Sequence, residues 1–152
     1  MRYVHTNIIS NDWQKLADFY INTFQCKIIL PERNQSGDWL SKGTGVKNAQ
    51  LEGVHLLLPG HGENGPTLEI YQYKESLQQD PIQPNTRGFA HIAFEVDNVE
   101  KVLKNLLSNG GSKCGDISEK QIENIGKITF VYARDPEGNL IEIQNWERIQ
   151  NQ

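Results

Sequence analysis

Hydrophobic and polar residues follow the same order of elements twice along the chain. In the first half, alternation over residues 3–9 predicts a strand, and an apolar stripe at helical spacing over residues 13–21 predicts a helix. Asn11 is the predicted helix cap, with Gln14 three residues later as in a capping box. Three more strands are predicted at residues 27–30, 49–58 and 66–73. Pro31 should stop the first of these, and residues 32–47 should form an irregular excursion with a short strand near Trp39.

The pattern restarts after residues 75–86, a polar stretch with two prolines that is typical of a linker. Alternation over residues 89–96 predicts a strand, and Asp97 with Glu100 forms a second capping box at the start of a helix. Further strands are predicted at residues 113–116, 128–133 and 140–146. The order is again β-α-β-β-β. We therefore expect an α+β fold in which residues 1–152 form a single domain of two tandem βαβββ modules, about 1–74 and 87–147.

The last two strands flank a turn with the sequence D-P-E-G-N. Pro136 presets φ at the first corner, and Gly138 can take the positive φ that closes the turn. In the strand that follows, Ile141 and Ile143 face one way and Glu142 faces the other. Glu142 has no Lys or Arg within four residues, so burial of its carboxylate is costly without a compensating charge. A metal ion could supply that charge.

Each half carries one histidine on its first strand and one glutamate on its last strand. These are His5 and Glu69 in the first half, and His91 and Glu142 in the second. If a pseudo-twofold axis relates the halves and their sheets curl around a shared cleft, the four side chains converge. Two imidazoles and two carboxylates suit a single divalent ion of Ni, Co, Zn, Mn or Fe. The alternative, ordinary strand histidines and solvated glutamates, explains any one of them but not their matched placement.

Residues on the same strand faces as these candidate ligands should line a substrate pocket. They are Asn7, Ile9, Tyr71, Phe89, Ala93, Leu140 and Gln144. Their mixed character predicts a partly apolar small-molecule substrate held by a few polar anchors. His55 and His61 are interpreted as structural or solvated residues, and Cys26 as a core residue.

Charge and cysteine content narrow the possible partners and the compartment. The net charge of −4 comes without a basic stripe, which argues against nucleic acid or a membrane surface as a partner. Cys26 and Cys114 lack metal-binding or disulfide-framework spacing, and no apolar run is long enough for a signal peptide or a membrane span. We therefore expect a cytoplasmic protein.

The chain resembles the vicinal oxygen chelate superfamily, also called the glyoxalase/bleomycin resistance/dioxygenase family, over residues 3–146. Four motifs carry the resemblance: Y-V-H-T-N-I at 3–8, T-L-E-I at 67–70, G-F-A-H-I-A-F-E-V-D at 88–97 and D-P-E-G-N-L-I-E-I at 135–143. The resemblance implies paired βαβββ modules that form a curled mixed sheet around a metal cleft. It places the ion on His5, Glu69, His91 and Glu142. It also implies a possible homodimer, with each site held within one chain or shared between two.

The ligand order His-Glu-His-Glu resembles that of glyoxalase I enzymes. The resemblance therefore predicts a metal-dependent lyase or isomerase of the lactoylglutathione lyase type. In such an enzyme the metal stabilises an enediolate while a glutamate moves the proton beside a carbonyl. Glu142 is favoured as this base, although the pseudo-symmetry also allows Glu69.

Two other functions stay open at this point. One is a methylmalonyl-CoA-type epimerase, which uses the same proton chemistry, and the other is a non-catalytic small-molecule binding protein of the bleomycin resistance type. Glyoxalase I enzymes often carry an Arg four residues after the first His and an Asn four residues after the first Glu, both contacting glutathione. Ile9 and Tyr73 occupy those positions here, so the sequence leaves the thiol partner open.

Overall fold

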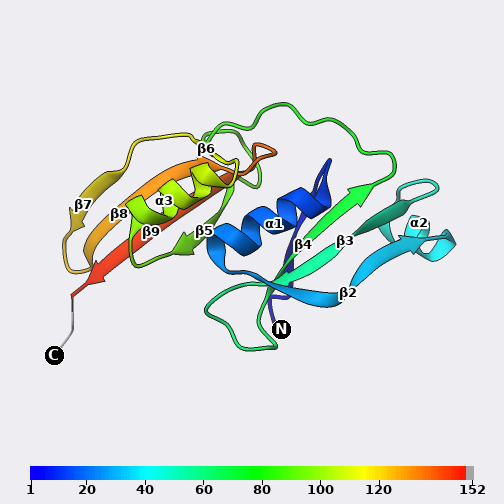
Figure 1. Ribbon diagram of the computed structural model, residues 1–152, viewed down its shortest axis with the longest axis horizontal. Helices are drawn as coiled ribbons and strands as arrows, with labels where there is room; N and C mark the ends of the chain where they lie inside the picture. The colour runs from blue at the N-terminus through cyan, green and yellow to red at the C-terminus, as the bar shows by residue number, and fades with distance from the viewer. Residues whose placement is uncertain (150–152) are drawn as a thin grey trace. The chain divides into compact units, whose positions relative to one another are not determined.

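The computed structural model describes residues 1–149, which form two compact units (Figure 1). The first unit is Met1–Gln79 and the second begins at Asp80, within the stretch predicted as a linker. The elements of the first unit are β1 (His5–Ile9), α1 (Trp13–Phe24), β2 (Lys27–Ser36), α2 (Asp38–Thr44), β3 (Gln50–Leu57) and β4 (Thr67–Tyr73). Its strands lie in the order β1-β4-β3-β2, with β1 parallel to β4 and the other neighbours antiparallel.

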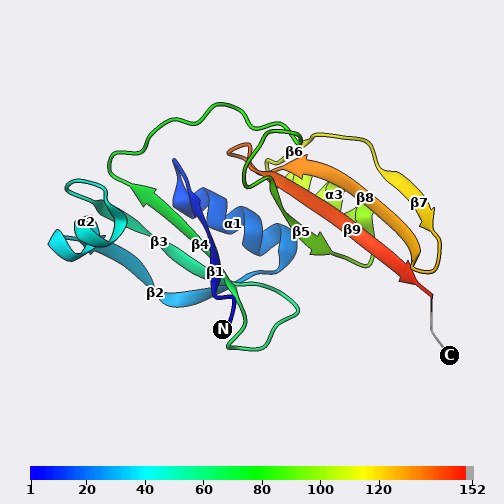
Figure 2. The ribbon, with the colours of Figure 1, turned by 180° about the vertical axis from the view of Figure 1, so that it is seen from behind.

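Helix α1 covers one face of this sheet. The two opposite views show the helix in front of β1 and β4 in one and the strands in front of the helix in the other (Figures 1 and 2). Its buried stripe includes Leu16 and Tyr20, and the sheet contributes a buried set of Val54, Leu56, Leu68 and Ile70. Burial of these side chains is the main stabilising contribution in the unit.

The cap of α1 lies one residue later than predicted. Asp12 is the cap, and its Oδ1 accepts a hydrogen bond from the backbone N–H of Lys15 at 3.0 Å. The prediction of Asn11 was therefore wrong. The extended backbone at Asp12 lets its carboxylate reach an N–H group of the first turn, which has no acceptor within the helix.

Residues 31–44 differ most from the sequence prediction. Strand β2 does not stop at Pro31 but continues to Ser36, with a shift in its pairing to β3 between Ile29 and Arg33. A proline is tolerated there because β2 is an edge strand and the irregularity removes the need for its missing N–H. Helix α2 then takes the place of the irregular excursion and of the short strand predicted near Trp39, so both predictions were wrong.

The second unit repeats the same plan with an additional strand. Its elements are β5 (His91–Glu95), α3 (Val99–Ser108), β6 (Ser112–Lys113), β7 (Ser118–Ile122), β8 (Gly126–Arg134) and β9 (Leu140–Arg148). The sheet order is β5-β9-β8-β6, β7 also pairs with β8, and β5 is parallel to β9. The sequence did not predict β7, which is a mostly exposed edge strand without apolar alternation.

Helix α3 begins at a different cap from the one predicted. Asn98, not Asp97, accepts the backbone N–H of Lys101, at 2.7 Å. The sheet contributes a buried set of Phe94, Val131, Ile141 and Ile143.

The predicted α+β class with two βαβββ modules is confirmed, and each described sheet is curled and open at its edges. Within residues 1–149, no helix is long and apolar enough to cross a membrane.

Candidate metal centre

In the first unit, His5 and Glu69 lie side by side on neighbouring parallel strands. His5 pairs with Thr67, so Glu69 is two residues further along β4 and projects from the same face. Its Oε1 is 3.2 Å from His5 Nδ1. The face is the one that α1 does not cover, and the Glu69 side chain is only 12% exposed.

The second unit contains the same arrangement. His91 pairs with Leu140, which is again two residues before the glutamate, and Glu142 Oε2 lies 3.0 Å from His91 Nε2. The Glu142 side chain is 14% exposed. Each half of the predicted ligand set therefore forms a histidine–glutamate pair in the same strand register. The prediction that both pairs share one ion concerns two separate units and stays a prediction.

His55 is a neighbour of Glu69 that the sequence interpretation overlooked. Its Nε2 lies 3.3 Å from Glu69 Oε1 and 2.6 Å from the hydroxyl of Tyr71. Strands β3 and β4 pair His55 with Glu69, and the loop between them is symmetric about Gly62, with Leu58 N–H donating to Pro66 O. The signal was present in the sequence, because counting outward from the centre of P-G-H-G-E-N-G gives this pairing.

Tyr132 is the corresponding neighbour of Glu142. It pairs with Glu142 across β8 and β9, its hydroxyl hydrogen-bonds to the Glu142 carboxylate, and its ring centroid is 5.0 Å from that of His91. The predicted turn fixes this pairing, because the backbone N–H of Asp135 donates to Asn139 O at 3.0 Å. Counting back from that turn places Tyr132 opposite Glu142.

The pKa shifts around both pairs keep the neighbouring groups uncharged. Burial, reinforced by the negative charge of Glu69, raises the pKa of the Tyr71 hydroxyl to about 12. Burial and then Glu142 raise the pKa of Tyr132 in the same way. Burial lowers the pKa of His55, and the Glu69 carboxylate opposes that shift only in part. Both phenols therefore remain hydrogen-bond donors at neutral pH, and His55 is a neutral imidazole.

The chemistry of the two pairs suits a divalent cation. Both carboxylates are mostly buried, and in the described part of the chain neither forms an ion pair with a Lys or an Arg. A buried carboxylate needs a compensating positive charge, and imidazole nitrogen with carboxylate oxygen fits Ni, Co, Zn, Mn or Fe. Over residues 1–149, no three His, Cys, Asp or Glu side chains are arranged to hold an ion. Each pair thus offers one imidazole nitrogen and one carboxylate oxygen, which are donors that such an ion accepts.

The residues predicted to line a substrate pocket have different surroundings. Asn7 donates its side-chain amide to Glu69 O at 3.1 Å, Tyr71 bonds His55, and Gln144 accepts the indole N–H of Trp146 at 3.1 Å. Phe89 is exposed just before β5, Ala93 is exposed within β5, and Leu140 is only 3% exposed. Ile9 lines a hollow of about 990 Å³ in the first unit.

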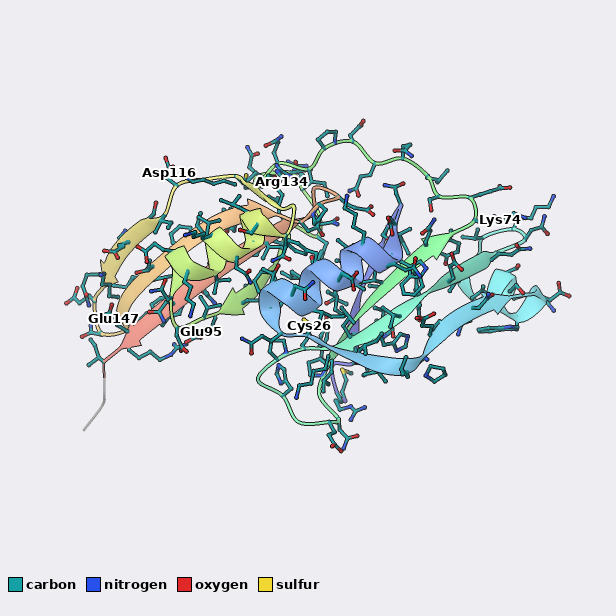
Figure 3. The ribbon with its side chains drawn as sticks, in the orientation of Figure 1. Cys26, Lys74, Glu95, Asp116, Arg134 and Glu147 are labelled. Atoms are coloured by element: carbon teal, nitrogen blue, oxygen red, sulfur yellow. The ribbon has the colours of Figure 1, made fainter. Side chains whose placement is uncertain are left out.

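That hollow lies at the far end of β1 and β4 from His5. Ile9 and Tyr73 line it, and both share the strand face of His5 and Glu69 because they follow at even spacing. Its lining includes two basic residues, Lys47 and Lys74, and two acidic residues, Asp38 and Glu75. Figure 3 labels Lys74 just beyond the end of β4. Ile9 and Tyr73 are the two positions at which the resemblance to glyoxalase I enzymes breaks down.

Comparison with known proteins agrees with this architecture. The sequence profile of the Glyoxalase/Bleomycin resistance protein/Dioxygenase superfamily matches residues 2–143. The chain belongs to this superfamily. It is 29% identical over 150 residues to a lactoylglutathione lyase of Schizosaccharomyces pombe, a match that covers 91% of this chain and 45% of that protein. The chain thus spans about half the length of this curated relative.

Solved structures of the superfamily share the fold. A glyoxalase family protein from Bacillus cereus matches with a TM-score of 0.74 at 20% identity, covering 96% of this chain and 93% of that one. A variant of glyoxalase I from Zea mays matches with a TM-score of 0.63 at 21% identity, covering 94% of this chain and 44% of that one. These matches confirm the fold predicted from the sequence.

Proposed function

We propose that this protein is a metal-dependent lyase or isomerase of the glyoxalase type, acting on an α-hydroxy carbonyl compound or its thiol adduct. The observation that carries the proposal is the matched placement of His5 with Glu69 and of His91 with Glu142. The similarity to a lactoylglutathione lyase supports the same class of reaction. These four residues would hold the ion, either within one chain or across a homodimer.

When bound, a divalent metal would act as a Lewis acid on neighbouring substrate oxygens and so acidify the adjacent carbon-bound proton. The chain itself has to accept that proton and return it. A largely buried carboxylate has the raised basicity that such a transfer needs. The contacts favour Glu142 for this role. It is bonded by His91 and Tyr132, whereas Glu69 has His5, His55 and Tyr71 around it and is held more firmly.

The remote part of the substrate is proposed to lie in the hollow beside Ile9. Lys47 and Lys74 could bind carboxylates there, and Asp38 and Glu75 could bind an ammonium group. Both kinds of charge occur together in a peptide-like or amino-acid-like tail. This supports a zwitterionic thiol as the partner of the carbonyl substrate, bound by side chains other than the Arg and Asn that glyoxalase I enzymes often use.

Metal analysis and two activity assays test the proposal on the full chain. We expect stoichiometric divalent metal in the purified protein, stabilisation against heat by Ni²⁺ or Co²⁺, and turnover of methylglyoxal with a thiol such as glutathione. Turnover of methylmalonyl-CoA instead would assign the epimerase function. Absence of bound metal, of stabilisation and of both activities would overturn the proposal in favour of a small-molecule binding protein.

A further inference from the structure

The two histidine–glutamate pairs differ in what surrounds them, although the strands around them have the same register. In the first unit, β3 places His55 opposite Glu69, and in the second unit β8 places Tyr132 opposite Glu142. Two residues further along, Tyr71 of β4 corresponds to Gln144 of β9. A third imidazole is therefore present beside one carboxylate and not at the matching point beside the other.

We propose that His55, supported by Tyr71, is a positioning residue that fixes the carboxylate of Glu69 in the metal centre. This inference rests on the proposed function and assigns a role to a residue outside the ligand set. A carboxylate can only accept hydrogen bonds, so the side chains that surround it decide which of its lone pairs remain available to an ion. Residues that hydrogen-bond to a metal ligand orient that ligand and raise the affinity of the site for the metal.

Hydrogen-bond donors surround the carboxylate of Glu69. His55 Nε2 lies beside two oxygen atoms, Glu69 Oε1 at 3.3 Å and the Tyr71 hydroxyl at 2.6 Å, so its proton belongs on Nε2. The hydroxyl of Tyr71 in turn hydrogen-bonds to the Glu69 carboxylate. His55 thereby restrains Glu69 from β3, on the side opposite β1, together with Tyr71 of β4 itself, while His5 approaches from β1.

The backbone of β3 is adapted to this arrangement at Gly53. Gly53 pairs with Tyr71, and a Cβ atom there would lie 2.0 Å from Ile70 O and 2.7 Å from the Tyr71 ring. Glycine therefore leaves the space in which the Tyr71 ring lies. The ring extends along the strand toward His55, two residues beyond Gly53, with a ring centroid distance of 5.8 Å.

The same geometry argues against His55 as a direct ligand. Its Nε2 faces both Glu69 and the Tyr71 hydroxyl, and because that nitrogen carries the proton it has no lone pair for an ion bound to the Glu69 carboxylate. Within residues 1–149, His5, His55 and Glu69 are also not arranged as a three-donor metal group. His55 thus acts on the ion through Glu69.

Cobalt binding by the full chain tests the inference, with Co²⁺ itself as the probe. His55→Ala should raise the Kd for Co²⁺ by about 10- to 100-fold and shift the visible absorption bands of the bound ion. His55→Gln should restore part of the affinity, because its amide can donate to Glu69. His61→Ala is the matched control, since it removes an exposed imidazole from the same unit and should change neither quantity.

Three outcomes would overturn the inference. One is His55→Ala with the wild-type Kd and spectrum. Another is complete loss of binding in His55→Ala, equal to that in Glu69→Ala, which would make His55 a ligand. If His55→Ala does not fold, as judged by circular dichroism, Tyr71→Phe decides: a raised Kd supports the inference and a wild-type Kd overturns it. A wild-type chain that binds no Co²⁺ would instead refute the proposed metal centre itself.

Discussion

Glu142 Oε2 lies 3.0 Å from His91 Nε2, and the two residues come from neighbouring parallel strands. The parallel pairing of β5 with β9 sets up this contact. The turn before β9 fixes the pairing of β8 with β9, and that pairing puts Tyr132 against the same carboxylate. Within residues 1–149 the geometry brings His91 and Tyr132 to this mostly buried carboxylate, which is why the proposed function assigns the proton transfer to Glu142.

Replacement of Glu142 by Gln should remove most of the turnover and leave the fold intact. The amide keeps the size of the side chain but cannot accept the substrate proton, so we expect kcat to fall by about 100- to 10,000-fold. Steady-state kinetics of the metal-loaded variant, with circular dichroism for the fold, measures this. Glu123→Gln, at an exposed turn position, is the control and should keep full activity. Unchanged kcat in Glu142→Gln would remove Glu142 from the mechanism.

Lys47 and Lys74 should contribute to binding of the substrate and not to the chemical step. Both line the hollow beside Ile9, which lies at the Tyr73 end of β4 and away from Glu69. Lys47→Ala and Lys74→Ala should therefore raise KM for a substrate with a carboxylate-bearing tail and leave kcat unchanged. Lys42→Ala, in the last turn of α2 and outside the lining of the hollow, is the matched control. A fall in kcat with constant KM would contradict this placement of the tail.

Gly53→Ala should destabilise the first unit. A Cβ at Gly53 would overlap the carbonyl oxygen of Ile70 at 2.0 Å, and φ of +155° is unfavourable for alanine. We expect a loss of about 1–3 kcal/mol in the free energy of unfolding, measured with urea. Gly62→Ala is the control, because its Cβ would meet nothing within 4 Å. Equal stability of the two variants would show that Gly53 is not needed for the placement of Tyr71.

The histidine–glutamate pairs could be predicted from the sequence because strand periodicity and repetition act together. Alternation fixes the face of each residue, and the second copy of the pattern shows which residues correspond. His55 and Tyr132 escaped prediction because their position depends on pairing across a hairpin. That register is set by the turns around Gly62 and at residues 135–139, and it becomes visible only when residues are counted outward from each turn.

Local patterns also failed where the surrounding structure decides the conformation. Pro31 would end a central strand, but β2 lies at the edge of the sheet, where a shift in its pairing with β3 accommodates the proline. Helix α2 has only seven residues and buries only Leu40, too few for a helical stripe to be recognised. Leu40 packs with Ala49 and Leu51 against Tyr71 and Tyr73, so this helix is held by contacts distant in sequence.

Asp135→Ala should destabilise the turn that aligns Tyr132 with Glu142. Asp135 is 2% exposed, and its carboxylate accepts hydrogen bonds from the backbone N–H groups of Glu137 and Asn139 and from the Asn139 amide. Loss of these buried, charge-assisted bonds should cost about 2–3 kcal/mol in the free energy of unfolding. Urea denaturation gives the value. Asp116→Ala removes an exposed carboxylate that pairs with Lys113 and should leave stability unchanged. An equal loss in both variants would contradict the role of the turn.

The two cysteines should differ sharply in reactivity toward alkylating agents. Cys26 lies between α1 and β2, is 2% exposed, and burial raises the pKa of its thiol to about 12 (Figure 3). Since only the thiolate reacts, iodoacetamide at pH 8 should modify the half-buried Cys114 and spare Cys26 until the chain unfolds. Mass spectrometry of the intact protein and of its peptides measures both sites.

The raised pKa of Cys26 also predicts how the stability of the folded chain changes with pH. The folded chain holds this proton more tightly than the unfolded chain, so the contribution of Cys26 is complete below pH 9 and is lost as pH rises toward 12. Cys26→Ala should abolish that part of the alkaline loss, whereas Cys114→Ala should retain it. Rapid alkylation of Cys26 in the folded protein at pH 8 would contradict its burial between the helix and the sheet edge.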